Sequence, residues 1–161
     1  MAVDNETSSS KRFFVDQGSL TDILLYSTFE KMQLTKASLT LCKGDLVGFP
    51  GERVNVRGAI WLRTMFDSQP KVKTIDVKYL VINIPNPYDM ILGRSSLNTI
   101  GAVVSTPHLA VKFPISEIEV NVLHADQKEA QWCYKECLKP RMAEPRNELI
   151  SPQAFPRVKD K

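Results

Sequence analysis

A single aspartate stands out as the residue best placed for chemistry. Asp16 follows the apolar, β-prone run 13–15 and precedes Gln17, Gly18 and Ser19. A strand fixes the backbone ahead of the carboxylate, Gly18 permits a tight turn without a Cβ, and the Ser19 hydroxyl can hydrogen-bond nearby. A carboxylate held in this way can act as a general acid or base. Asp-x-Gly also marks ordinary surface turns, so the pattern alone leaves both interpretations open.

A second stretch must be considered with the first. Residues 88–98 predict an apolar strand end, then Gly93, then a short helix opened by Ser95 or Ser96. Gly101 is suited to the C-terminal cap of that helix. The chain therefore places a strand and a carboxylate first, and a strand, a glycine and a helix later.

Four motifs in this order resemble the retropepsins, the small aspartic proteases of retroviruses and retrotransposons. The resemblance spans roughly residues 11 to 138 and is strongest with the protease region of plant Ty3/gypsy-type retrotransposon polyproteins. The motifs that carry it are residues 15–24, 46–52, 91–94 and 100–109.

The resemblance implies a fold and a reaction. The fold would be mainly β with short helices, a retropepsin-like closed β-barrel forming one half of an acid protease. Its N-terminal strands would be missing, because only a polar decapeptide precedes Lys11. Peptide hydrolysis of this kind needs two carboxylates that share a proton. The chain has one Asp-x-Gly and no internal repeat, so the resemblance implies a homodimer in which Asp16 meets its own copy on a polypeptide substrate. It implies no metal and no cofactor.

The resemblance also assigns roles to other residues. Gln17, Gly18 and Ser19 would form the active-site loop. The tip of a hairpin would cover the substrate as a flap, formed by Phe49, Pro50, Gly51 and Glu52. Structural support behind the loop would come from Leu92, Gly93 and Arg94.

Two of these assignments depart from the family pattern. Arg94 matches an arginine that pairs with an acid four residues past the catalytic aspartate, where this chain has Leu20; Asp22 is the nearest substitute. Gln17 stands where active relatives carry Thr or Ser. The alternatives are therefore an active aspartic endopeptidase and a non-catalytic dimerisation or peptide-binding remnant. Asp89 lacks the Asp-x-Gly turn, and we do not pair it with Asp16.

Periodicity predicts the elements that position these motifs. Thr21 or Asp22 caps a predicted helix to about Gln33. A predicted hairpin over 38–66 turns at Pro50-Gly51, and a strand follows over 72–82. Three short strands are expected at 102–105, 109–113 and 118–123, and a helix at 126–138 with Asp126 as its cap.

Length and composition set the remaining bounds. The 161 residues are 43% hydrophobic, which predicts one domain at 11–138 between a disordered lead-in, 1–10, and a disordered linker or tail, 139–161. The net charge is +3, and basic residues in the tail favour a solvated linker over a nucleic-acid-binding arm.

The sequence also bears on the location of the protein and on metal binding. Without an apolar leader or an apolar run long enough to span a membrane, we expect an intracellular, cytoplasmic protein with no membrane association. Cys42, Cys133 and Cys137 fit reduced thiols there. Cys133, Cys137 and His124 are too few to predict a zinc site. Neither histidine adjoins a nucleophile of the serine or cysteine protease type.

Overall fold

The structure, a computed structural model, describes residues 2–4, 8–9, 12–42, 44–48, 51, 53–68 and 71–139. Its strands are β1 (Ala2–Asp4), β2 (Ser8–Ser9), β3 (Phe13–Val15), β4 (Asp22–Leu25), β5 (Asp45–Val47), β6 (Arg53–Ser68), β7 (Lys71–Ile82), β8 (Met90–Leu92), β9 (Val103–Ser105), β10 (Ala110–Pro114) and β11 (Val120–His124). Its helices are α1 (Tyr26–Lys31), α2 (Arg94–Ile100), α3 (Gln127–Leu138) and the 3-10 helix η1 (Lys36–Ser38). The expected mainly β fold with short helices is confirmed.

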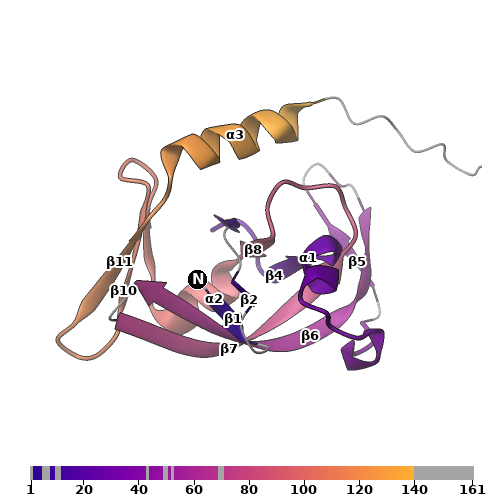
Figure 1. The fold of residues 1–161 in the computed structure, drawn as a ribbon, viewed down its shortest axis with the longest axis horizontal. Coiled ribbons are helices and arrows are strands. Elements are labelled where there is room, and N and C mark those ends of the chain that lie inside the picture. Colours follow the sequence, from indigo (N-terminus) through magenta and orange to yellow (C-terminus); the bar gives the residue numbers. More distant parts are fainter. Residues whose placement is uncertain are drawn as a thin grey trace, which may run out of the picture.

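The larger sheet is organised by the long hairpin of β6 and β7, which curves beneath the other strands (Figure 1). Its strand order is β2-β1-β6-β7-β4-β8-β3, and β5 also pairs with β6. This path is open at both ends, so the sheet forms a curled half-barrel and does not close. Strand β4 is buried at all four of its residues because both of its faces are covered.

One hydrophobic core lies inside the curl. Alternate residues of β6 and β7 point into it, as expected for strands with one buried face. They meet α1, β8, α2 and β10, and the fully buried side chains include Leu24, Phe29, Tyr79, Val81, Met90, Leu92 and Phe113. Because β4 and β8 run through this core, the loops at their ends are held on both sides.

The helix predicted from Thr21 or Asp22 is wrong over its first turn. Asp22–Leu25 is instead strand β4, which pairs in parallel with β7 and antiparallel with β8. All four of its residues are buried. A short apolar run covered on both faces is typical of a central strand, whose burial outweighs the helical spacing. The helix begins only at Tyr26.

The N-terminal segment also differs from the expected disordered lead-in without strands. Strand β1 pairs antiparallel with β6 over residues 63–65, and β2 pairs with β1. The physical reason is the length of β6, which extends past β5 and leaves backbone groups free for another strand.

The C-terminal part follows the prediction closely. Strands β9, β10 and β11 form an antiparallel sheet in which β10 is central. Helix α3 follows β11 and runs across the molecule at the upper edge of the view (Figure 1). Asp126 caps it as predicted, accepting hydrogen bonds from the Lys128 and Glu129 N–H groups. The tail predicted beyond Lys139 lies outside the described residues.

Candidate active site

Asp16 lies at the end of β3, at the entrance to a tight turn. Its Oδ1 accepts hydrogen bonds from the Gly18 N–H at 2.8 Å and the Ser19 N–H at 3.3 Å. Its own N–H donates to the Leu92 carbonyl of β8 at 2.9 Å. Among the described residues, Oδ1 is the only carboxyl oxygen of Asp16 with a hydrogen-bond partner. The turn therefore orients the carboxyl group while leaving its second oxygen available.

Gly93 packs directly against the backbone of the turn. A Cβ at this position would lie 2.3 Å from the Thr21 carbonyl oxygen and 3.0 Å from the Ser19 carbonyl oxygen. These are backbone atoms, which cannot rotate away as a flexible side chain could. Only glycine therefore allows the end of β8 to pass this close to the turn.

Helix α2 starts directly after this contact and adds one backbone hydrogen bond to the turn. The Arg94 N–H donates to the Ser19 carbonyl at 2.9 Å. At its other end, Gly101 takes the left-handed conformation predicted for the C-terminal cap, with φ of 67°. The helix begins at Arg94 with Gly93 as its N-cap residue, so it starts slightly earlier than the Ser95 or Ser96 opening predicted.

Asp22, which the sequence predicted as a possible helix cap, instead supports the loop behind Asp16. Its buried Oδ1 accepts the Gly93 N–H at 2.8 Å, linking β4 to the start of α2. Burial raises the pKa of the Asp22 carboxyl, while the Gly93 N–H and Ser96 oppose that shift. The signal was present in the sequence as a single acid at the start of an apolar run.

The suggested ion pair between Arg94 and Asp22 does not form. The Arg94 side chain is exposed, and among the described residues its guanidinium makes no ion pair. Within the described ranges, Arg94 contacts the loop through its backbone N–H. Asp22 reaches the same helix through the Gly93 N–H, so a backbone donor takes the place expected for a guanidinium.

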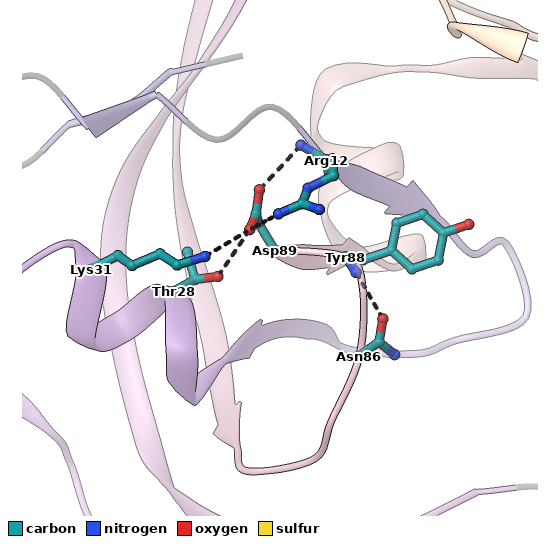
Figure 2. A network of polar contacts seen from close by, with 6 residues as sticks. All are labelled: Arg12, Thr28, Lys31, Asn86, Tyr88 and Asp89. Atoms are coloured by element: carbon teal, nitrogen blue, oxygen red, sulfur yellow. Dashed lines mark hydrogen bonds and ion pairs between the residues drawn. The ribbon is translucent and has the colours of Figure 1, made fainter. Parts of the chain in front are cut away.

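Asp89 directly precedes β8, so it lies at the opposite end of the parallel β3–β8 pair from Asp16. Figure 2 shows the Asp89 carboxylate with the residues that contact it. Its carboxylate accepts the Arg12 N–H at 3.2 Å and lies 3.8 Å from the Arg12 guanidinium. The Lys31 ammonium is 3.9 Å away, and the Thr28 hydroxyl donates at 3.5 Å. Asp89 therefore joins three segments of the chain.

The predicted hairpin is confirmed in its strands. Strand β5 pairs with β6 over Leu46 and Val54, and an isolated bridge joins Thr40 to Ala59. At the tip, the Gly51 N–H donates to the Gly48 carbonyl at 2.7 Å. The other predicted flap residues, Phe49, Pro50 and Glu52, lie outside the described residues.

Other chemistries find little support in the described part of the chain. Ser105 Oγ and His108 Nδ1 are 2.7 Å apart, but Ser105 ends β9 and His108 lies in the exposed turn that follows, where such a contact closes the turn. No three His, Cys, Asp or Glu residues gather as metal ligands within the described ranges. None of the helices that the structure describes is long and apolar enough to cross a membrane.

Comparison with known proteins found no matching family model and no matching curated protein. Among solved structures, the chain is similar to the retroviral protease-like domain of Ddi1 from Leishmania major. The identity is 21%, the TM-score is 0.47, and the match covers 71% of this chain and 86% of that chain. It is also similar to EIAV protease complexed with the inhibitor HBY-793, at 18% identity and a TM-score of 0.41, over 65% of this chain and 99% of that chain.

Proposed function

We propose that this chain is a retropepsin-like aspartic endopeptidase domain that acts as a homodimer on a polypeptide. The observation that carries the proposal is the orientation of the Asp16 carboxyl by the N–H groups of its own turn. The turn is in addition braced by Gly93 and by the Arg94 N–H. Such bracing suits a catalytic carboxylate, because catalysis needs a group held in one geometry.

The chemistry would require two copies of Asp16 across a two-fold axis. One carboxylate takes a proton from a water molecule as the water oxygen attacks the peptide carbonyl carbon, and the protonated partner donates to the carbonyl oxygen. The carbon–nitrogen bond then breaks as the leaving nitrogen takes the proton that the first carboxyl received from water, and a hydroxyl of the tetrahedral intermediate returns a proton to the partner carboxylate. Phe49, Pro50, Gly51 and Glu52 would cover the substrate as a flap.

The origin of the chain is part of the same proposal. The order of the four motifs supports a protease region of a plant Ty3/gypsy-type polyprotein, acting within the cytoplasm on that polyprotein. No metal, cofactor, membrane or nucleic acid enters this scheme.

A second candidate function is a dimerisation or peptide-binding module without catalysis. The exposed Gln17 favours it, because a long amide side chain replaces the compact hydroxyl that locks two such loops together in active relatives. The dimer could then form more weakly, or with the two carboxylates too far apart to share a proton.

The test is cleavage of a diverse peptide pool at mildly acidic pH and high protein concentration. The wild-type chain is compared with Asp16→Asn, and with Asp76→Asn as a matched control at an exposed acid that pairs with Arg63 on the surface. Cleavage lost only in Asp16→Asn supports the endopeptidase. Equal absence of cleavage in all three folded proteins, with a dimer seen by analytical ultracentrifugation, favours the binding module.

A further inference from the structure

A cavity of about 400 Å³ lies between β3, the sheet of β9 to β11, and α3. Its wall is formed mostly by apolar side chains, including Phe14, Leu109, Val111, Leu123, Ala130 and Cys133. Phe14 and Leu109 are 41% and 40% exposed, so the cavity communicates with solvent. Its size falls within the range of small-molecule sites in proteins.

The walls of this cavity are fixed by contacts that do not depend on filling it. Asp126 caps α3 with two hydrogen bonds, and Arg12 lies over the Trp132 ring at 5.6 Å from its centre. Leu109 is held in the left-handed region, with φ of 47°, where its carbonyl accepts the Ala125 N–H at 2.8 Å. Backbone strain at a non-glycine residue persists only where its surroundings impose it.

Helix α3 itself contributes little to the core. Cys133 is its only buried residue, while Trp132, Tyr134 and Leu138 remain exposed. None of these three exposed side chains lines the cavity, to which α3 contributes Glu129, Ala130 and Cys133. Ala130 is only half-buried, so a molecule in the cavity would add contacts to it.

The charges near the rim indicate what kind of molecule fits. Arg12 is already engaged by Asp89 at 3.8 Å, and the Asp126 carboxylate is bonded to the first turn of α3. Glu129 and His124 also line the cavity, and the Glu129 carboxylate repels an anion. An uncharged ligand avoids the cost of moving a charge out of water. An apolar ligand exchanges water for side-chain contacts.

We propose that this cavity binds a small, neutral, apolar molecule beneath α3. Its lining reaches Val15 but includes no residue of the Asp16 turn, so binding does not depend on the endopeptidase activity. Binding should hold α3 more firmly on the cavity.

The test uses N-phenyl-1-naphthylamine, a neutral apolar probe whose fluorescence rises when it leaves water. Titration of the full chain should give saturable, one-to-one binding. Ala130→Trp should weaken binding at least tenfold, because the new ring occupies the cavity. Gln131→Trp, on the exposed side of the same helix, should bind as the wild-type chain does. Asp16→Asn should also bind normally, which separates this site from the proposed catalysis.

A second readout guards against misfolding of Ala130→Trp. With Cys42→Ser and Cys137→Ser combined, Cys133 is the only thiol, and the probe should slow its modification by methyl methanethiosulfonate at least threefold. Absence of saturable binding by the folded wild-type chain would overturn the proposal. So would binding that Ala130→Trp leaves unchanged, or modification of Cys133 at the same rate with and without probe.

Discussion

Strands β3 and β8 run parallel and are joined at both ends, but by different kinds of interaction. At one end, Asp89 meets two cations and a hydroxyl. At the other end, the partners of the Asp16 carboxylate among the described residues are backbone N–H groups, and Gly93 packs on backbone carbonyls. The same strand pair thus has one carboxylate that lies beside cations and one that is held by the backbone.

This difference shows how hydrogen bonds can orient a carboxylate without pairing its charge with a cation. A nearby cation would stabilise the charged form and commit the carboxylate to it. Backbone donors from the turn fix the geometry through one oxygen only. We call the end at Asp89 the ionic end and the end at Asp16 and Gly93 the backbone end. The ionic end then contributes to stability, and the backbone end positions the carboxylate of the proposed reaction.

The backbone end should be broken most severely by Gly93→Ala. The added Cβ would overlap the Thr21 carbonyl at 2.3 Å, so β8 and the turn must separate. We expect the free energy of unfolding to fall by about 3 kcal/mol or more, as for severe overpacking. Urea denaturation measures this, with Ser95→Ala on the exposed start of α2 as control. A loss under 1 kcal/mol would contradict the close approach.

The ionic end should be less sensitive, and Asp89→Asn tests it. The substitution removes the charge facing Arg12 and Lys31 but keeps an oxygen that can accept the Arg12 N–H. We expect a loss of about 2 kcal/mol, because the site is largely buried. Asp45→Asn is the control, since its pair with Arg53 is more exposed and should be worth under about 0.5 kcal/mol. Equal losses in the two variants would remove the distinction between them.

Much of this arrangement could be predicted from the sequence, and the failures have physical causes. The Asp16 turn, the Gly101 cap and the Asp126 cap follow from local chemistry, in which each residue acts on neighbours within a few positions. The role of Asp22 does not, because its partner is the distant Gly93 N–H. The strand β4 was mistaken for helix for the same reason: its pairing with β7 and β8 is a tertiary contact that periodicity does not encode.

Asp22, which binds Gly93 at the backbone end, should make the stability of the fold depend on pH. Burial raises the pKa of this carboxyl above its ordinary value of 3.8, so the folded chain binds the proton more tightly than the unfolded chain. The resulting stabilisation is complete below 3.8 and is lost as the pH rises through the raised value. Asp22→Asn keeps an acceptor for the Gly93 N–H without this titration. The stability of the variant relative to the wild type should therefore increase with pH across that window, measured by thermal unfolding. A difference independent of pH would exclude a buried, titrating Asp22.

The smallest effect should come from Arg94→Ala, because the Arg94 side chain makes no contact with the Asp16 turn among the interactions of the described residues. Arg94 reaches the Asp16 turn through its N–H to the Ser19 carbonyl, which alanine retains. We expect the free energy of unfolding to change by less than about 0.5 kcal/mol, as is usual for an exposed side chain. The monomer–dimer equilibrium should also be unchanged in sedimentation experiments, with Arg63→Ala as a surface control. A large loss of stability or of dimer would mean that the guanidinium finds an acid after all, and that the two ends of the strand pair are both ionic.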